Sequence, residues 1–250
     1  MSKNRTANTP DRATPEMEAN PYDEERPRSL LMRLRLVTEL LNNLIARPPM
    51  LYRLFFPEAI WRIQVSHDRR RHDRRVFLTF DDGPVPEVTP QVLDMLDELG
   101  VKATFFMVGE NAMRHPELVE EVRRRGHSIG SHTMHHMQGL HTTWLAYARD
   151  VAQAAELLDT RLFRPPHGIM KPEQLRVMNA RYNIIMYDVV SRDYSRRLTA
   201  HEVCRNVCRF ARNGSIIVFH DSVKAAPRML EAMPRAVRWL KKQGYEFDVL

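Results

Sequence analysis

From residue 76 to the end of the chain, short apolar runs alternate with longer stretches in which apolar residues recur every three or four positions. Short apolar runs bounded by turn residues are typical of buried strands, and the wider spacing is typical of amphipathic helices. The pattern predicts about seven strands separated by helices. The predicted strands are VFLTF (76–80), ATFFMVG (103–109), HSIGSHT (127–133), LFRPP (162–166), NIIMYDVV (183–190), SIIVFHD (215–221) and YEFDVL (245–250).

Capping residues mark the ends of the helices between these strands. Thr89 and Pro90 suit the N-cap and the first position of one helix, and Gly100 suits its C-terminal cap. Thr199 suits the N-cap of a later helix that we expect to end at Asn213-Gly214. Strands that alternate with helices form parallel βαβ units, so the sequence predicts an α/β fold, either a barrel or an open sheet. In both folds the chemistry lies at the C-terminal ends of the strands.

The first 75 residues lack this alternation. Residues 1–29 have no periodicity and no run of large apolar side chains, which predicts a disordered tail. Residues 30–75 are interpreted as a helical and aromatic segment followed by a basic linker, HDRRRHDRR (67–75). The aromatic part, LYRLFFPEAIWRI (51–63), could pack on the main domain or on a membrane surface. Residues 76–250 are the predicted main domain.

The formal net charge of +7 belongs mainly to the N-terminal part. Residues 1–75 hold 15 Lys and Arg against 10 Asp and Glu, a charge of +5, so residues 76–250 hold the remaining 23 against 21, a charge of +2. A basic arm favours contact with lipid or nucleic acid, although a solvated tail is the simpler interpretation. We expect no nucleic-acid partner, and we keep a weak contact of the arm with a membrane or another anionic surface as an alternative.

Neither a membrane span nor a secretory signal is evident in the sequence. No apolar run reaches the roughly 18 residues that a transmembrane helix needs, and no continuous apolar core of a signal peptide occurs near the start. The location is left unknown, with the cytoplasm or the membrane periphery as the default expectation. Cys204 and Cys208 cannot anchor a disulfide framework and are predicted to be buried, small apolar residues.

Ionisable side chains gather at the ends of five predicted strands, which we expect to meet at one rim of the sheet. The adjacent Asp81 and Asp82 would point to opposite faces of a strand, so one could bind a metal ion while the other faces a water molecule. A turn role is the alternative, because Asp-Gly-Pro favours turns. The strand-end residues are Asp81 and Asp82, His132 and His136, Arg164, Asp188 and Asp193, and His220 and Asp221.

The histidines of HTMHH (132–136) have the spacing of a metal site. Two imidazoles four residues apart can meet at one point, and two imidazoles with one carboxylate are a common catalytic zinc set. His135 and His141 lie nearby, so the spacing by itself does not decide which pair would bind.

Five short motifs together resemble the ordered motifs of the polysaccharide deacetylase family of carbohydrate esterases. The resemblance covers roughly residues 76–245 and implies a distorted (β/α) barrel with fewer than eight strands as the catalytic domain, residues 76–250, preceded by a partly disordered arm. The motifs are TFDDGP (79–84), HTMHH (132–136), RPPHG (164–168), SRDY (191–194) and VFHD (218–221).

The resemblance implies a metal site and a general base. Asp82 corresponds to the carboxylate ligand, and His132 and His136 complete the ligand set. Asp81 corresponds to the general base that takes a proton from the attacking water, and Arg164 corresponds to the residue that pairs with this base. One divalent ion is expected, with Zn²⁺ as the first choice and Co²⁺, Mn²⁺ or Ni²⁺ as alternatives.

The resemblance also implies a general acid and an acyl pocket. His220 corresponds to the acid that protonates the leaving amine, and Asp193 corresponds to the carboxylate that orients this histidine. The backbone N–H of His167 falls where the family has an oxyanion donor. Tyr194, Phe219 and Met186 are expected to line the acetyl pocket.

Four positions depart from the residues that are usual in the family. Ser131 replaces Asn, His167 replaces Tyr, Val190 replaces Asp and Tyr194 replaces Trp. None of these changes removes a proposed catalytic group. They do alter the surface that would face a sugar, so the resemblance leaves the identity of the sugar open.

The resulting hypothesis is a metal-dependent hydrolase that removes N-acetyl groups from amino sugars of a chitin-like, peptidoglycan or cell-surface glycan. The same metal chemistry on a non-sugar amide or an O-acetyl ester is an alternative, because the motifs describe the metal site and not the substrate. A non-catalytic glycan-binding protein with a relict site is a third hypothesis, which the intact ionisable residues disfavour.

Several other residues receive structural interpretations. Asp188 is interpreted mainly as a structural residue at a strand end, and Asp221 and Ser222 as caps of the turn after their strand. Trp144 and Trp239 occur in predicted helices, where we expect them to contribute to the core and not to bind sugars.

Overall fold

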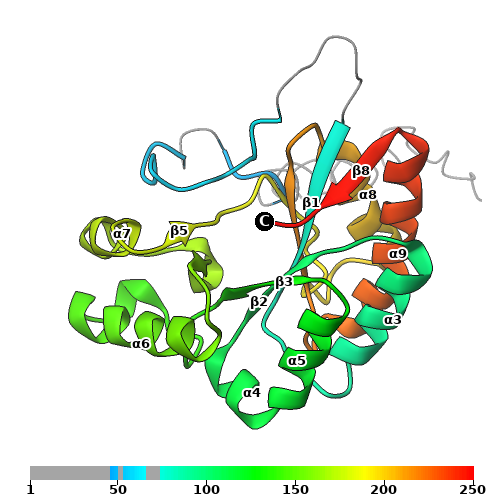
Figure 1. The fold of residues 1–250 in the computed structure, drawn as a ribbon. Helices are drawn as coiled ribbons and strands as arrows, with labels where there is room; N and C mark the ends of the chain where they lie inside the picture. The colour runs from blue at the N-terminus through cyan, green and yellow to red at the C-terminus, as the bar shows by residue number, and fades with distance from the viewer. Residues whose placement is uncertain (1–45, 50–52, 66–73) are drawn as a thin grey trace, which may run out of the picture. The chain divides into compact units, whose positions relative to one another are not determined.

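The computed structural model describes residues 46–49, 53–65 and 74–250 (Figure 1). The predicted disordered tail (1–29), most of the charge run 67–75 and most of the basic arm lie outside the described residues. None of the helices in the described ranges is long and apolar enough to cross a membrane.

A parallel sheet forms the centre of the fold, with β1 (Arg74–Asp81) in its middle. The C-terminal half of β1 pairs with β2 (Thr104–Met107) and β7 (Ile216–His220), and its N-terminal half pairs with β8 (Tyr245–Asp248). Beyond β2 lie β3 (Ser128–Ser131), β4 (Leu162–Phe163) and β5 (Asn183–Ile184), and beyond β7 lies β6 (Val189–Val190). The parallel pairing confirms the predicted α/β class.

Residues 183–190, predicted as one strand, form two strands at opposite edges of the sheet. The strand order is β5-β4-β3-β2-β1-β7-β6, so β5 and β6 lie at its two ends although residues 185–188 alone separate them in the chain. So short a connection requires the sheet to curl until its edges approach each other. The result is a distorted barrel with eight strands in the described part of the chain, where about seven were expected from the apolar runs.

The aromatic N-terminal segment, residues 53–65, connects the edge strand β5 with the turn that precedes β7. The Ile60 N–H donates to the Ile184 carbonyl at 2.8 Å, and the Ile63 N–H donates to the Gly214 carbonyl at 3.0 Å. Trp61 is buried and donates its indole N–H to the Phe56 carbonyl at 3.1 Å. Of the two surfaces considered for this segment, its described part packs on the main domain.

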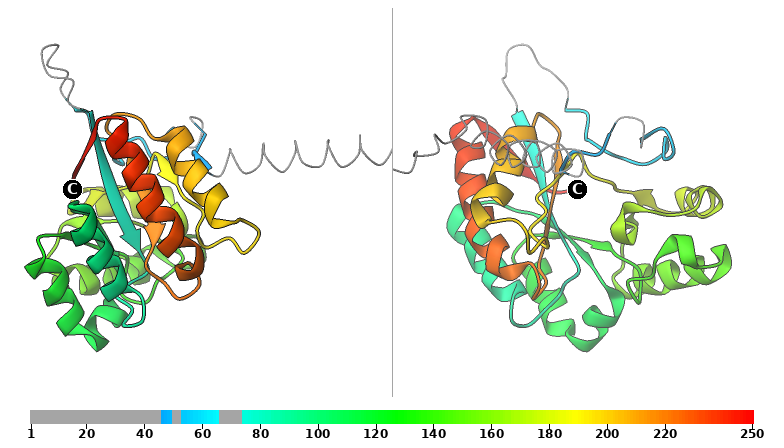
Figure 2. Two further views of the ribbon diagram at one scale, coloured as in Figure 1. Left: turned by 90° about the vertical axis from the view of Figure 1, so that its right-hand side faces the viewer. Right: turned by 180° about the vertical axis from the view of Figure 1, so that it is seen from behind.

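Helices pack on the outer face of the curled sheet. Helices α3 (Thr89–Leu99), α8 (Ala200–Phe210) and α9 (Ala226–Lys242) lie side by side next to β1 and β7 (Figures 1 and 2). Helices α6 (Trp144–Leu157) and α7 (Pro172–Asn179) pack on each other near β4 and β5. The remaining helices of the described residues are α4 (Gly109–Arg114), α5 (Pro116–Arg124) and two 3₁₀ turns, Gly139–His141 and Pro166–Gly168.

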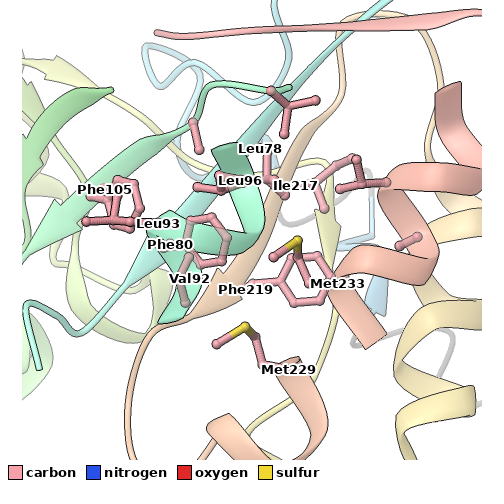
Figure 3. Close-up of a cluster of buried hydrophobic side chains, with 14 of the residues drawn as sticks. Leu78, Phe80, Val92, Leu93, Leu96, Phe105, Ile217, Phe219, Met229 and Met233 are labelled. Atoms are coloured by element: carbon pink, nitrogen blue, oxygen red, sulfur yellow. The ribbon is translucent and has the colours of Figure 1, made fainter. Parts of the chain in front are cut away.

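The largest apolar cluster lies between β1, β2 and β7 on one side and α3 and α9 on the other (Figure 3). Phe80 and Phe105 are almost fully buried, and their ring centroids are 5.0 Å apart. Burial of one such side chain contributes roughly 1.5–3 kcal/mol. This packing fixes the strands whose C-terminal ends carry Asp81 and His220.

The caps follow the sequence predictions in part. Gly100 ends α3 with a φ of 60°, and Thr199 caps α8 together with Glu202, as predicted. Thr89 does not cap α3: it is the first helical residue, and its hydroxyl donates to Asp221 at 2.7 Å. Helix α8 ends at Phe210, before the predicted end, because residues 211–215 form the turn that leads into β7.

Two predictions about buried side chains are wrong. Trp144 is 50% exposed at the start of α6 and Trp239 is 38% exposed on α9, so neither is a core residue. Both lie on the outer side of their helices, which periodicity over a short window did not distinguish from the inner side. Cys204 and Cys208 pack against the main apolar cluster but are only partly buried, with their sulfur atoms 3.8 Å apart.

Candidate active site

A cavity of about 440 Å³ opens at the C-terminal ends of the strands. Most of the ionisable residues predicted at the strand ends meet there, which confirms the expectation of a common rim. The lining residues are Asp81, Asp82, His132, His136, His167, Gly168, Tyr187, Val190, Tyr194, Val218, His220, Ser222 and Lys224.

Asp82, His132 and His136 converge at one side of the cavity. Asp82 Oδ1 lies 3.8 Å from His132 Nε2 and 3.3 Å from His136 Nε2. The φ of Asp82 is 84°, so the chain turns there and the adjacent Asp81 points elsewhere. Among the described residues, this is the only group of three or more His, Cys, Asp or Glu side chains whose ligand atoms all lie within 4.8 Å of one another.

The surroundings of His132 suit a metal ligand. Its Nδ1 lies 2.8 Å from the Arg164 carbonyl oxygen, which can only accept, so Nδ1 carries the proton and Nε2 presents a lone pair toward Asp82. Burial lowers the pKa of His132 to about 4, so the imidazole is neutral at pH 7. A neutral imidazole whose second nitrogen donates to a carbonyl is the usual form of a histidine ligand. The residues present therefore fit one divalent ion.

The structure decides between the neighbouring histidines. His135 is 54% exposed at its side chain, and its Nδ1 pairs with Asp150 Oδ2 at 2.6 Å. His141 does not line the cavity. The group that could hold a metal therefore contains His132 and His136, the pair that the family resemblance favours.

Asp81 forms a buried ion pair with Arg164. The Arg164 Nη1 donates to Asp81 Oδ1 at 2.6 Å and to the Thr79 hydroxyl at 2.8 Å. The remaining guanidinium N–H groups donate to the carbonyls of Ile185 and Met186, each at 3.2 Å. Burial lowers the pKa of Arg164, and the charge of Asp81 opposes this shift. Arg164 is fully buried and lies behind Asp81, out of the cavity lining.

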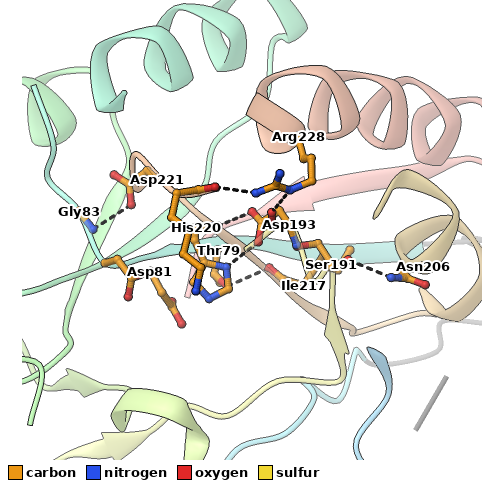
Figure 4. Close-up of polar contacts among 12 residues, drawn as sticks. Thr79, Asp81, Gly83, Ser191, Asp193, Asn206, Ile217, His220, Asp221 and Arg228 are labelled. Carbon is orange, nitrogen blue, oxygen red and sulfur yellow. Dashed lines mark hydrogen bonds and ion pairs between the residues drawn. The ribbon is translucent and has the colours of Figure 1, made fainter. Parts of the chain in front are cut away.

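His220 and Asp193 form a second pair (Figure 4). His220 Nδ1 lies 2.7 Å from Asp193 Oδ1, and the His220 backbone N–H donates to Asp193 Oδ2 at 2.8 Å. Burial would lower the pKa of His220, but the carboxylate of Asp193 outweighs it and raises this pKa to about 9. The Tyr194 ring packs edge-on against the imidazole, with centroids 5.1 Å apart. A protonated imidazole therefore faces the cavity at neutral pH.

His167 lines the cavity beside the metal-binding group. Its φ of 59° lies in the left-handed region, and its ring centroid is 5.0 Å from that of His136. Burial lowers the pKa of His167, and the charges of nearby histidines and of Lys224 lower it further. These effects favour the neutral form of the ring, which keeps one lone pair for accepting a hydrogen bond.

Two residues that were predicted to line the acetyl pocket do not line the cavity, so these two predictions are wrong. Phe219 is fully buried in the main apolar cluster (Figure 3), and Met186 is fully buried in a second cluster. Side chains alternate across a strand, so Val218 and His220 face the cavity while Phe219 faces the helices. Tyr194 does line the cavity, as predicted.

Three polar residues of the lining were not predicted from the sequence to line the cavity: Tyr187, Ser222 and Lys224. Tyr187 follows β5 and packs edge-on against Trp61 at a centroid distance of 6.1 Å. It lies inside the predicted strand 183–190, so no sequence pattern marked it as a residue of the rim. Lys224 lies in the loop after β7, where no periodicity indicates the direction of a side chain.

Asp188 and Asp221 are buried outside the cavity lining. Asp188 accepts hydrogen bonds from Arg53, Arg212 and Ser215 at 2.6–2.8 Å, in keeping with the structural interpretation. Asp221 accepts from the Gly83 N–H at 3.0 Å and from Thr89 (Figure 4). Burial raises the pKa of Asp221 to about 8. Both carboxyl groups hold the segments that carry the cavity residues.

Comparison with known proteins identifies related sequences. A model of the family described as polysaccharide deacetylase matches residues 68–182. A peptidoglycan-N-acetylglucosamine deacetylase of Bacillus cereus is 32% identical over 191 residues, which are 73% of this chain and 89% of that protein. A chitooligosaccharide deacetylase of Sinorhizobium fredii is 36% identical over 154 residues, 58% of this chain and 71% of that protein. Some relatives are longer: the match covers 38% of a deacetylase from Listeria monocytogenes.

A solved structure has the same fold. The crystal structure of the Bc1960 peptidoglycan N-acetylglucosamine deacetylase, in complex with a hydroxamate-type benzamide, matches with a TM-score of 0.68 and 31% sequence identity. The match covers 72% of this chain and 87% of that chain. The distorted barrel described above is therefore shared with this enzyme.

Proposed function

The chain belongs to the polysaccharide deacetylase family, and on that basis we propose that it hydrolyses the N-acetyl group of an amino sugar within a glycan. One observation carries the proposal: a group suited to a metal ion and two charged pairs surround a single cavity. The named relatives act on peptidoglycan and on chitooligosaccharides, and glycans of these two kinds are the proposed substrate class.

Asp82, His132 and His136 would hold one divalent ion. When bound, this ion supplies Lewis acidity, which polarises the amide carbonyl and makes water a stronger acid. We propose Zn²⁺, because two neutral imidazoles and one carboxylate are a common catalytic zinc set. Co²⁺, Mn²⁺ and Ni²⁺ accept the same donors and are the alternatives to be tested.

Asp81 would act as the general base. It would take a proton from the water that attacks the carbonyl carbon, and the Arg164 guanidinium at 2.6 Å would hold the carboxylate in place. The buried guanidinium also offsets the charge of Asp81. The new bond joins the water oxygen to the acetyl carbon, and the negative charge moves to the former carbonyl oxygen.

His220 would act as the general acid. As the C–N bond breaks, its proton moves to the leaving nitrogen, which departs as the amine, and acetate is the other product. The charged form that this step requires is the form that Asp193 stabilises. The backbone N–H of His167 is the proposed donor to the oxyanion, and Tyr194 would border the acetyl group.

The test combines metal content with acetate release. Purified protein loaded with Zn²⁺ should bind one ion and release acetate from chitooligosaccharides or peptidoglycan fragments. Asp81→Asn should keep the metal and lose roughly 10²–10⁴-fold in turnover, the usual contribution of a general base. Asp94→Asn, an exposed residue of α3, is the matched control and should keep both.

The outcomes separate the parts of the proposal. Turnover at the wild-type rate by Asp81→Asn would refute the role of this residue. Metal binding without acetate release from any glycan would refute the substrate class, and simple acetylated amides and O-acetyl esters would then be assayed. A protein that binds no divalent ion would refute the whole mechanism.

A further inference from the structure

Lys224 is a cationic residue of the cavity that the proposed reaction does not use. It lies four residues after His220, in the loop that joins β7 to α9, and lines the cavity together with Tyr194 and Ser222. We propose that Lys224 binds an anionic group, a carboxylate or a phosphate, that the substrate sugar carries next to its acetamido group. This inference rests on the proposed function of the same cavity.

The charges of the cavity support this assignment, because its other charged groups have partners. Asp81 pairs with Arg164, and His220 pairs with Asp193. Asp82 faces two histidines that would share a metal ion with it. Within residues 46–49, 53–65 and 74–250, no carboxylate oxygen lies close enough to Lys224 Nζ, at 4.0 Å or less, to form an ion pair. Its charge is therefore available to a ligand.

The ammonium group is held at the side of the general acid. Lys224 Nζ lies 5.8 Å from the centroid of the Tyr194 ring, within the range of a cation–π contact. The same ring packs against His220 at 5.1 Å. The cation is thus near the proposed position of the leaving nitrogen.

This position selects the part of the sugar that Lys224 would contact. In a 2-acetamido sugar, the ring carbons that flank the nitrogen-bearing carbon are C1 and C3. Substituents on their oxygens are the groups that come closest to the leaving nitrogen. A carboxylate carried on O3, or a phosphate on O1, would therefore approach Lys224 when the nitrogen approaches His220.

The loop that carries Lys224 is anchored at several points. Arg228 donates to the Asp193 carbonyl through Nε and to the Lys224 carbonyl through Nη2, both at 2.6 Å (Figure 4 shows Arg228 beside Asp193). The Ala225 N–H donates to the Ser222 carbonyl at 3.0 Å. Because the backbone of Lys224 is tied to that of Asp193, its side chain starts from a fixed point relative to the acid pair.

The experiment compares three probes with the full-length, Zn²⁺-loaded protein. The neutral probe is chitotetraose, the carboxylate probe is the same oligosaccharide with a 3-O-carboxyethyl group, and the phosphate probe carries a 1-phosphate. We expect the wild type to prefer an anionic probe in kcat/KM. Lys224→Met should reduce the ratio of anionic to neutral kcat/KM by roughly tenfold, the size of one charge-assisted contact. Lys224→Arg should retain most of the preference.

Lys242→Met is the matched control, because Lys242 is an exposed lysine at the end of α9 and outside the cavity. It should leave the ratio unchanged. A preference that does not fall in Lys224→Met, or that falls equally in both variants, would overturn the inference. The anionic probe with the higher kcat/KM shows whether Lys224 recognises a carboxylate or a phosphate.

Equilibrium binding separates this inference from the proposed function. If no probe is hydrolysed, the proposed function fails, but calorimetric titration with the same probes still tests Lys224. Tighter binding of an anionic probe by the wild type than by Lys224→Met would then support the inference. Equal binding by both proteins would overturn it.

Discussion

The curled sheet consists of two unequal parts. In the first part, called the paired part (β1, β2, β3, β7 and β8), strands of four to eight residues make continuous ladders. In the second, called the tied part (residues 162–193), β4, β5 and β6 have two residues each. Two-residue strands make few ladder hydrogen bonds, so other contacts must hold the tied part in place.

Those contacts come from polar side chains. Arg164 donates to the carbonyls of residues 185 and 186, and Asp188 accepts from Arg53, Arg212 and Ser215. The paired part instead depends on the large apolar cluster of Figure 3. The paired part thus depends mainly on the large apolar cluster, whereas the tied part adds buried ion pairs to a smaller apolar cluster of its own.

The charged pairs of the cavity lie where the paired part and the tied part meet. Asp81 belongs to the paired part and Arg164 to the tied part, and the same holds for His220 and Asp193. Each pair therefore joins the two parts of the sheet and also sets the geometry of the cavity. Changes in these pairs should affect stability and activity together, whereas changes remote from these pairs and from the metal-binding group should affect stability alone.

Arg164→Met should have the largest effect. It leaves Asp81 buried without its cation, and breaking a buried pair in this way costs about 3–5 kcal/mol of unfolding free energy. Turnover should fall roughly 10²–10⁴-fold, because the proposed base loses its fixed position. Denaturant unfolding and acetate release measure the two quantities.

Arg125→Met is the control for this variant. Arg125 pairs at the surface with Asp94, Asp97 and Glu121, and such pairs contribute at most about 1 kcal/mol. If Arg164→Met is no less stable than Arg125→Met, the view that Arg164 joins the two parts of the sheet is wrong.

Substitution of one buried phenylalanine in each part allows the two parts of the sheet to be compared directly. Phe105 in the paired part and Phe163 in the tied part are both almost fully buried, so replacing either with Ala should cost about 3–5 kcal/mol. Phe105→Ala should keep the turnover of each folded molecule, whereas Phe163→Ala should lower it, because Phe163 directly precedes Arg164. Turnover is measured at a temperature where both variants are folded. Equal turnover in the two variants would contradict the distinction.

Asp188→Asn should have a smaller effect, on stability alone. Its partners Arg53 and Arg212 are 22% and 39% exposed, so they regain contact with water when the carboxylate is lost. The cost should be about 1–3 kcal/mol, the value of hydrogen bonds to a charged group. Thermal unfolding measures the loss, and Ser215→Ala, which removes one of these bonds, should lose less. A drop in turnover without a drop in stability would instead assign Asp188 a direct role in the reaction.

The paired part and the metal-binding group were largely predictable from the sequence. Long apolar runs and their capping residues predict strands and helices, and parallel strands bring Asp81, Asp82, His132 and His136 to one rim. The crossing at residues 185–188 was not predictable, because an apolar run looks the same whether a strand continues or passes to the other edge. Strand alternation, applied from His220, would have placed Phe219 in the core.

Lys224 and the contact between Trp61 and Tyr187 had no signal in the sequence. Both depend on how loops and the N-terminal segment fold against the barrel, and hydrophobic periodicity carries no information on loop direction. The predictable features are thus those that repeat along the chain, whereas Lys224 and Tyr187 line the cavity from segments without such a repeat.

The smallest expected effect is a pH dependence set by the pair that joins β7 to the tied part. The pKa of His220 is raised from its ordinary value near 6.5 to about 9, so the imidazolium persists across neutral pH. Its contribution to stability is complete below about pH 6.5 and is lost as the pH rises through about 9. Because a general acid must be protonated, acetate release should be constant between about pH 7 and 8.5 with respect to this group and fall roughly tenfold per pH unit above 9. Asp193→Asn removes the carboxylate that raises this pKa, so its alkaline decline should begin at lower pH. An alkaline decline that stays at the same pH in Asp193→Asn would show that a group other than His220 sets it.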